Sequence, residues 1–328
     1  MLVALTYDLK DEWRSRGYSE EMIAEMDSSV TIDAIDASLR TLGYETVRIG
    51  SIFSLVEYLA GGRRCDLVFN IAEGLHGLLR ESQVPALLDA YQIPYVFSDS
   101  FTLALTLHKE LAKRVVREAN VPTAESVLIS RLDDLGRVDR AYPLFVKPVG
   151  GGTGMGISGL SKVESVGELR EVTSQLLAQF AQPVLVEQYL EGREFTVGIT
   201  GTGEEASSVG VMEIVVDSAC DGGIYSYKSK QEYLEVTEYR KADGEAKERC
   251  EAVALAAWRA LSCRDGGRVD LKMDSRGVPN FLEVNPLAGL HPIDSDLPIL
   301  SRMHGLSYDG LIARIMASAC RRIGLCTS

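Results

Sequence analysis

The chain has 328 residues, which suggests two or three domains and enough length to bury a sizeable core. Its 46% hydrophobic and 25% charged residues are typical of a soluble globular protein, and a formal net charge of −13 argues against nucleic-acid and anionic-membrane partners. The six cysteines have no metal-type spacing and no apolar run approaches a membrane span, so we expect free thiols in a cytoplasmic protein.

Residues 1–98 alternate between predicted strands and helices, which indicates the α/β class and a doubly wound parallel sheet. We expect strands at Leu2–Thr6, Thr46–Ile49, Leu67–Ile71 and Tyr95–Phe97, and helices near Ser28–Leu42, Phe53–Ala60 and Val84–Gln92. Ligands of such sheets bind at the carboxyl ends of the strands. Two loops at that edge, Asp8–Asp27 and Ala72–Ser82, are either one wall of a substrate cleft or solvated connections.

A boundary is expected near residue 98, where Ser98-Asp99-Ser100 caps a predicted long helix that carries Lys109. The next unit contains a predicted strand, Leu144–Val149, that runs into Gly150–Gly156, with five glycines in seven residues. Such a segment exposes backbone N–H groups and lets the chain approach an anion closely. Because neither the Walker nor the Rossmann spacing fits, and Ile157–Lys162 predicts another strand, we interpret it as a hairpin with a glycine flap. A simple flexible turn is the alternative.

A buried strand at Val184–Val186 leads into the short segment Glu187–Leu190, and Glu194–Thr200 is predicted as the next strand. An adenine ring could lie against such a segment, although an interdomain hinge explains it equally well. Gly222–Tyr239 lacks clear periodicity and predicts a long mobile loop, in which Lys228 and Lys230 are cations that could close on phosphate. Helices are predicted near Glu248–Ala260, Ile299–Met303 and Tyr308–Arg321.

The stretch from Arg268 to Pro292 predicts two short alternating strands joined by a polar turn. Side chains two apart on a strand share a face, so Arg268 lies beside Asp270 and Glu283 beside Asn285. In an antiparallel hairpin these four groups converge. Hard oxygen ligands of this kind suit Mg²⁺, which also bridges to substrate phosphates. The alternative is a polar face whose charges pair in solvent.

Phosphoryl transfer requires cations on the phosphates, Mg²⁺ and an enclosed site, and four separated features fit it. They are Lys109, Lys147 with its flap, Glu187–Leu190 and the hairpin patch. Their order resembles the ATP-grasp ligases, specifically the D-alanine–D-alanine ligase branch, from about Leu67 to about Arg321. The resemblance is carried by FVKPVGGGTGMGIS, VEQYLEGREFTVGI and RVDLKMDSRGVPNFLEVNPLAG.

This resemblance implies an ATP-grasp fold of three units. Residues 1–98 would form the N-terminal pre-ATP-grasp domain, 99–190 the small domain with the flap, and 191–328 the domain with the magnesium and catalytic site. It also implies ATP and two Mg²⁺ as cofactors. The residues implied for nucleotide binding are Lys109, Lys147, Gly152, Thr153, Glu187, Gln188, Tyr189, Leu190, Glu194 and Lys230. Those implied for metal binding are Asp270, Glu283 and Asn285, while Arg268, the backbone N–H of Gly289 and Lys230 would act in catalysis.

The implied reaction has two steps. A carboxylate takes the γ-phosphoryl group of ATP, giving an acylphosphate and ADP, and an amine then attacks to form an amide and expel phosphate. The resemblance implies small-molecule substrates, a carboxylate and an amine that are both amino acids, and a homodimer is a family-level expectation. Electrostatics and positioning carry both steps, so no nucleophilic side chain is required.

Departures from the family pattern fall on the substrate side. The first loop, TYDLKDEWRSRGYSEEM, lacks the family's glycine-rich pattern, and AEGLHGLLRES places Glu73 near the position of a family histidine. HPIDSDLP is one residue longer and more acidic than the family's serine segment. We therefore expect a rewritten substrate site that includes Glu73, His291, Asp294, Ser295 and Asp296.

The two aspartates of that segment lead to the hypothesis of a cationic amine partner, with helix capping near Leu297 as the alternative. Two other functions stay open for the whole chain. One is a true D-alanine–D-alanine ligase with a divergent entrance. The other is a nucleotide-binding protein without turnover, which would have no need of the oxyanion arginine Arg268.

Overall fold

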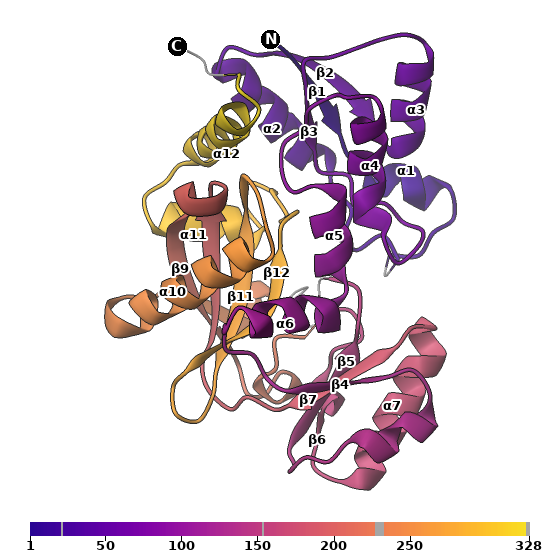
Figure 1. Ribbon diagram of the computed structural model, residues 1–328, viewed down its shortest axis with the longest axis vertical. Helices are drawn as coiled ribbons and strands as arrows, with labels where there is room; N and C mark the ends of the chain where they lie inside the picture. The colour runs from indigo at the N-terminus through magenta and orange to yellow at the C-terminus, as the bar shows by residue number, and fades with distance from the viewer. Residues whose placement is uncertain (21, 153, 227–232, 326–328) are drawn as a thin grey trace.

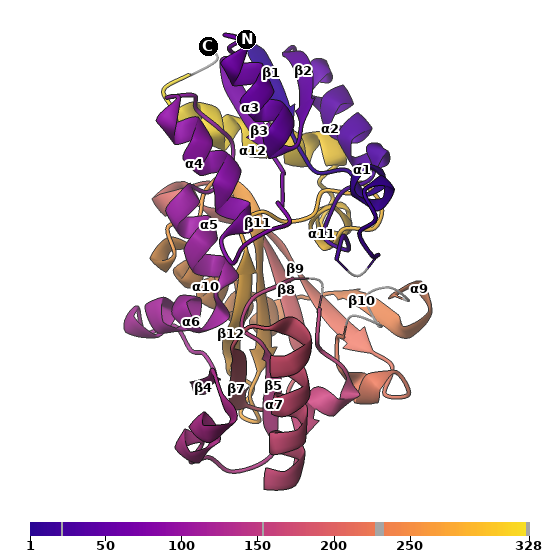
Figure 2. The same ribbon diagram turned by 90° about the vertical axis from the view of Figure 1, so that its right-hand side faces the viewer.

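The computed structural model describes residues 1–20, 22–152, 154–226 and 233–325. Three units follow one another along the long axis of the molecule (Figures 1 and 2). The sheet of the N-terminal residues lies at one end, the sheet of the C-terminal residues in the middle, and a small sheet from the middle of the chain at the other end. The predicted mixture of helices and sheets is therefore confirmed.

The N-terminal unit is built on a parallel sheet in the order β2-β1-β3. Its strands are β1 (Leu2–Thr6), β2 (Glu45–Gly50) and β3 (Leu67–Asn70). The predicted fourth strand at Tyr95–Phe97 is reduced to a single parallel bridge between Val68 and Tyr95. The helices around it are α1 (Lys10–Ser15), α2 (Ser29–Thr41), α3 (Ile52–Ala60) and α4 (Gln83–Ala90). Helices on both faces explain why β3 is buried along its whole length.

The single long helix predicted after residue 98 is wrong, because the chain breaks at His108. Asp99 caps α5 (Ser100–Leu107) as predicted, accepting a hydrogen bond from the Thr102 N–H at 2.8 Å. His108 has an extended backbone (φ −95°, ψ 93°), and its Nδ1 caps α6 (Lys109–Glu118). The break brings Lys109 into the first turn of α6, where its N–H donates to the carbonyl of Val149 beside the glycine flap.

The small sheet has the antiparallel order β4-β7-β5-β6, with α7 (Val166–Phe180) against it. Its strands are β4 (Ser126–Ile129), β5 (Leu144–Pro148), β6 (Lys162–Val163) and β7 (Val184–Gln188). The strand predicted at Ile157–Lys162 is wrong for most of its length. Ser158 caps a 3₁₀ turn there by accepting from the Leu160 N–H, and a serine that bonds locally competes with strand pairing.

The C-terminal sheet has the antiparallel order β10-β9-β8-β11-β12. Its strands are β8 (Glu194–Thr200), β9 (Ser207–Val216), β10 (Thr237–Lys241), β11 (Gly266–Met273) and β12 (Pro279–Asn285). The long loop predicted from Gly222 to Tyr239 is wrong in its described part. Tyr233–Val236 forms the helical turn α9, and the residues that follow pair with β9 as strand β10. Helix α10 (Gly244–Ala260) packs Trp258 into the core of this unit.

Five 3₁₀ turns complete the described elements: Arg80–Ser82, Leu132–Arg137, Gly159–Ser161, Gly203–Glu205 and Asp221–Gly223.

The last helix returns to the first unit. After α11 (Asp296–Met303), α12 (Tyr308–Arg322) packs Ile312, Ile315 and Met316 into the same core as the residues of β1 and α2. Both chain ends therefore lie at the same end of the molecule (Figure 1). The domain boundaries near residues 98 and 190 stay a prediction, since the core of the N-terminal unit is shared by both ends of the chain.

Asp265 ties these units together from a fully buried position. It pairs with Arg322 of α12 at 2.6 Å, and it accepts hydrogen bonds from the Phe97 N–H at 2.9 Å and from the Ser318 hydroxyl at 3.0 Å. Removing one partner of a buried ion pair leaves an uncompensated charge.

We therefore expect Asp265→Ala to lower the free energy of unfolding by roughly 3–5 kcal/mol, measured by urea denaturation. The exposed Asp133 is the matched control, and its alanine variant should stay within about 0.5 kcal/mol of the wild type. Equal denaturation midpoints for the two variants would contradict the assignment.

Candidate active site

The hairpin of β11 and β12 brings the four predicted groups onto one face. Its register places Arg268 opposite Asn285 and Asp270 opposite Glu283, with an irregularity just after Asp270. Asp270 accepts hydrogen bonds from the Asn285 amide at 3.1 Å and from the Thr196 hydroxyl at 2.8 Å, and Arg268 approaches it to 3.2 Å. The predicted convergence of these side chains is confirmed as geometry, because Arg268, Asp270 and Asn285 contact one another and Glu283 stands opposite Asp270 in the register.

Lys109 connects this hairpin to the glycine flap. Its ammonium lies 3.2 Å from Glu283 Oε2 and donates to the carbonyl of Gly151 at 2.5 Å. The side chain is only 9% exposed, so the ion pair is screened little by solvent. Lys109, Lys147, Asp270 and Glu283 line one cavity, so the predicted cations and carboxylates do meet across the units.

Glu187 is held between two lysines beneath that cavity. Its carboxylate lies 2.6 Å from Lys147 Nζ and 2.9 Å from Lys113 Nζ. Burial by itself raises the pKa of Glu187, but the two ammonium groups outweigh it and hold the pKa below its usual range. Burial lowers the pKa of Lys113, which has no exposed side-chain surface. Sequence reasoning missed this role of Lys113, because one lysine of a helix gives no sign of facing inward.

The remaining walls of this cavity combine flat apolar surfaces with polar groups. Tyr189 stacks on Phe145 with ring centroids 6.2 Å apart and an interplanar angle of 26°. Gln188 donates to the carbonyl of Pro143 at 3.0 Å, and Glu194 pairs with Lys272 at 2.7 Å. The predicted residues Glu187, Gln188, Tyr189, Leu190 and Glu194 all line the cavity, together with the unpredicted Phe145, Met155, Ile214, Lys272 and Leu282.

The glycine flap also borders a second cavity, which two loops of the N-terminal unit help to line. Gly151 and Gly152 both lie in its wall, and Glu25 Oε1 occupies the space that a Cβ of Gly152 would need. A larger residue at position 152 would therefore displace Glu25. Thr153 and the two loop lysines, Lys228 and Lys230, lie outside the described residues.

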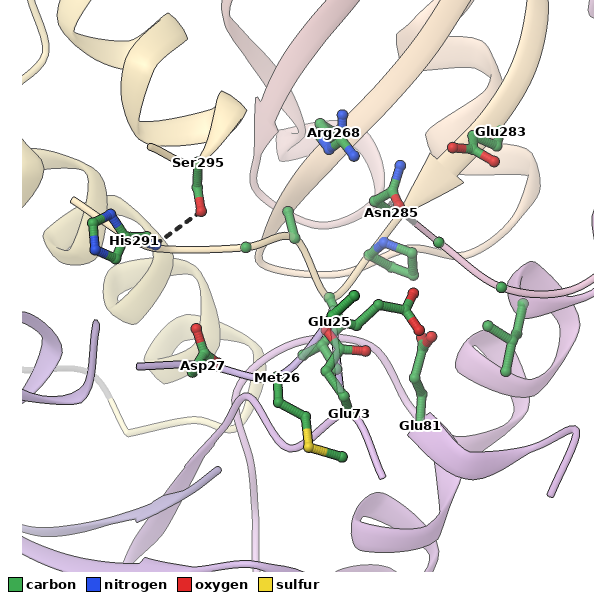
Figure 3. Close-up of a pocket in the computed structure, with 18 of the residues that line it drawn as sticks. Glu25, Met26, Asp27, Glu73, Glu81, Arg268, Glu283, Asn285, His291 and Ser295 are labelled. Atoms are coloured by element: carbon green, nitrogen blue, oxygen red, sulfur yellow. Dashed lines mark hydrogen bonds between the residues drawn. The ribbon is translucent and has the colours of Figure 1, made fainter. Parts of the chain in front are cut away.

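The second cavity has a volume of about 500 Å³ and a strongly acidic lining. Both loops predicted as a possible cleft wall contribute to it, since Lys10 and 24–28 come from the first loop and Glu73 and Glu81 from the second. Figure 3 shows Glu25, Glu73 and Glu81 gathered on one side, across from Asn285 and Glu283. The predicted substrate-end residues Glu73, Gly289, His291, Asp294 and Ser295 are all in this wall.

Crowded carboxylates give this cavity unusual acid–base properties. Burial raises the pKa of Glu81 to about 7, against the opposing pull of Arg80. Burial likewise raises the pKa of Asp27 to about 7, and burial next to Glu81 and Glu25 raises the pKa of Glu73 well above its usual range. Burial and mutual repulsion therefore favour the neutral forms of these carboxyl groups, and a cation bound beside them would favour their ionised forms.

Asp296 does not face the cavity as the cationic-partner hypothesis required. It lies half-buried at the start of α11, 2.7 Å from Arg268, and it accepts a hydrogen bond from the Tyr239 hydroxyl at 3.1 Å. Asp294 pairs instead with His291 at 3.1 Å, and His291 N–H donates to Ser295 at 3.0 Å (Figure 3). Ser295 precedes α11 without forming a side-chain cap, and Asp296 stands in the first turn of the helix, so the capping alternative for the two aspartates stays a prediction.

The donor set on the hairpin fits Mg²⁺. Within the described residues, no three His, Cys, Asp or Glu side chains stand at metal-binding distances, so the protein supplies no closed metal cage. Asp270 and Glu283 provide two carboxylates in the narrower cavity, and Asn285, which contacts Asp270, provides an amide oxygen beside Glu283 in the acidic cavity. Mg²⁺ takes one or two carboxylates and completes its shell with water and substrate phosphates, which this partial set allows.

Comparisons with known proteins agree with this geometry. The family model "D-ala D-ala ligase C-terminus" matches residues 126–317. A D-alanine–D-alanine ligase of Aquifex aeolicus is 31% identical over 86% of this chain and 92% of its own length. Two solved structures share the fold: a D-alanine–D-alanine ligase of Bacillus anthracis complexed with ATP (TM-score 0.73, 22% identity, 98% of both chains) and the VanG D-Ala:D-Ser ligase of Enterococcus faecalis (TM-score 0.74, 21% identity, 97% and 99%).

The fold and the site together define an ATP-grasp enzyme, an ATP-dependent ligase that forms C–N bonds. The chain belongs to the D-alanine–D-alanine ligase family. Among the residues that the structure describes, no helix has the length and apolar character needed to cross a membrane.

Proposed function

We propose that this enzyme joins two amino acids by a peptide-type bond, consuming ATP and releasing ADP and phosphate. The observation that carries the proposal is the junction of its two cavities. Lys109, Gly151 and Glu283 line both of them. A phosphoryl group held at this junction has the nucleotide cavity on one side and the acidic cavity on the other, as transfer from ATP to a bound carboxylate requires.

Nucleotide binding is assigned to the narrower cavity. Phe145, Met155 and Leu190 offer apolar surface for the adenine ring, while Lys147 and Lys109 offer positive charge to the phosphates. Glu194 stands in the same wall for the ribose hydroxyls. Thr153 and Lys230 keep their proposed roles at the phosphates by resemblance alone.

Asp270, Glu283 and Asn285 would hold the two magnesium ions of the proposal. Bound there, Mg²⁺ neutralises charge that develops on the transferring phosphoryl group. Lys109 lies 3.2 Å from Glu283 and Arg268 lies 3.2 Å from Asp270, so each carboxylate has a cationic partner. The site is therefore charged and oriented before the substrates arrive.

Arg268 and the N–H of Gly289 are proposed to stabilise the oxyanion of the tetrahedral intermediate. Both residues border the acidic cavity, and Asp270 and Asp296 fix the guanidinium at 3.2 and 2.7 Å. A donor that is oriented in advance needs no reorganisation as charge develops. A binding protein without turnover has no use for this arrangement, which speaks against the non-catalytic alternative.

D-alanine as both substrates is the second candidate, favoured by family membership. The acidic lining of the larger cavity favours other amino acids. The test is phosphate release from ATP with pooled D- and L-amino acids, followed by product identification by mass. If no pool of amino acids causes phosphate release, ligation is excluded. If D-alanyl-D-alanine is the product formed fastest, the second candidate is selected. A cytoplasmic location and a homodimer are further parts of this proposal.

Lys147→Ala is expected to weaken ATP binding by roughly tenfold to a hundredfold, because the ammonium makes charge-assisted contacts. The affinity is measured by titration calorimetry with ATP and Mg²⁺. Lys241→Ala is the control, since Lys241 is an exposed lysine on β10 that does not line this cavity. Unchanged ATP affinity in Lys147→Ala would contradict the assignment of this cavity.

A further inference from the structure

We propose that one substrate of this ligase carries a second cationic group in addition to its α-amino group, as an α,ω-diamino acid does. The inference rests on the proposed function, because it takes the acidic cavity as the amino-acid site. It concerns the class of substrate that this cavity selects. Three observations carry it. Acidic side chains outnumber basic ones in the wall, the local cations already interact with carboxylates, and two carboxylates neutralise Arg268.

The first observation is an excess of acidic over basic side chains in the wall. The cavity of about 500 Å³ is lined by six carboxylates and three cations among the described residues. The cations are Lys10, Lys109 and Arg268, and the carboxylates are Glu25, Asp27, Glu73, Glu81, Glu283 and Asp294. A zwitterionic amino acid with a neutral side chain brings one positive and one negative charge, so it cannot correct this imbalance.

The second observation concerns the side of the cavity that holds Glu25, Glu73 and Glu81. A single guanidinium, Arg80, serves this group: it pairs with Glu25 and lies 3.6 Å from Glu81. Glu73 forms no ion pair with any described residue. Among the described residues, Arg80 forms the ion pairs of this group. Burial and the crowding of the three carboxyl groups raise the pKa of Glu73 and Glu81, so a cationic ligand placed among them would favour their ionised forms.

The other cations of the wall already have partners. Lys109 is held by Glu283 at 3.2 Å and by the carbonyl of Gly151. The charge of Lys10 acts on Asp27, where it opposes the rise in pKa that burial causes. The α-ammonium of a substrate would satisfy one of the three carboxylates, and a second cation would satisfy another.

The third observation is that the arginine of the wall is already neutralised. Arg268 lies between Asp270 and Asp296, and Tyr239 donates to the same Asp296 carboxylate at 3.1 Å. The guanidinium therefore brings no net positive charge to the cavity that could favour an acidic side chain. Because acidic side chains outnumber basic ones in this wall, a dibasic substrate is favoured over an acidic one.

The test compares ornithine with norleucine, which have side chains of nearly the same length and differ in a terminal ammonium against a methyl group. Each enantiomer is supplied to the full-length enzyme with ATP, Mg²⁺ and a pool of amino acids as the second substrate. Binding of the same compounds is measured by calorimetry with ADP and Mg²⁺, which requires no turnover. We expect ornithine to exceed norleucine by roughly tenfold to a hundredfold in kcat/KM and in affinity.

Glu73→Gln keeps the shape of the side chain and removes its charge, so it should reduce the ornithine preference by about tenfold. Glu81→Gln serves as a second variant with the same expectation. Glu171→Gln, on the exposed face of α7, is the control and should leave the preference unchanged.

The outcomes separate this inference from the proposed function. Equal or better binding of norleucine, or of D-alanine, by the wild type would overturn the inference while ligation stands. A preference that persists in both glutamine variants would also overturn it. Binding selective for ornithine without phosphate release from any pair of amino acids would support the inference and reject the ligase activity.

Discussion

Glu283→Ala is expected to reduce turnover by roughly a thousandfold or more while the fold stays intact. Glu283 borders both cavities, it pairs with Lys109 at 3.2 Å, and its register partner on β11 is Asp270. A metal ion at a transferring phosphoryl group contributes several kcal/mol to transition-state stabilisation, and each 1.4 kcal/mol is a factor of ten in rate. Loss of one of only two carboxylates in the donor set should remove most of that contribution.

The rate is measured as ADP release with saturating ATP, Mg²⁺ and the best amino-acid pair. Glu238→Ala is the matched control, because Glu238 is an exposed glutamate on β10 of the same sheet. Circular dichroism and the thermal midpoint report whether the fold is kept, which is expected since the Glu283 side chain is 22% exposed and lies at a cavity rather than in the core. A rate within tenfold of the wild type would remove the metal assignment.

Arg268→Lys is expected to lower kcat by roughly a hundredfold to a thousandfold, the usual loss on removing an oxyanion donor. The guanidinium contacts Asp270 and Asp296 at once, which fixes its plane, whereas an ammonium group is a point charge without that fork. Burial lowers the pKa of Arg268, but the two carboxylates outweigh this and raise it, so the arginine carries its charge throughout the working pH range. The variant therefore tests geometry rather than the presence of charge.

The KM for ATP should change little, because Arg268 borders the acidic cavity and not the nucleotide cavity. Tyr239→Phe removes one hydrogen bond to Asp296 and leaves Arg268 in place, so it should lower kcat by about tenfold or less. A kcat for Arg268→Lys within twofold of the wild type would contradict the oxyanion role.

Local sequence pattern was sufficient wherever neighbours in the chain decide the structure. The alternation of polar and apolar residues in β11 and β12, with a polar turn between them, predicted that Arg268, Asp270, Glu283 and Asn285 share one face. Asp99 as a helix cap and the parallel strands β1 to β3 were predicted for the same reason. The family resemblance supplied the order of the units and the chemistry of the nucleotide side.

Where local signals compete, sequence reasoning was wrong. The break at His108 replaced one long helix by two, and the serine cap at Ser158 replaced a strand by a 3₁₀ turn. Strand β10 formed in a segment without clear periodicity because the long strand β9 offered it an edge to pair with. A short, partly exposed strand that pairs with a distant strand does not need a regular alternation of polar and apolar residues.

The sequence by itself determined the class of enzyme and the face that Asp270, Glu283 and Asn285, the proposed magnesium ligands, share. Only the tertiary structure decided that Glu25 and Glu81 join Glu73 around Arg80, that Lys113 lies beneath Glu187, and that Asp296 neutralises Arg268. The physical reason is that the spacing along a strand fixes which side chains share its face, whereas burial and charge compensation depend on residues that only folding brings together.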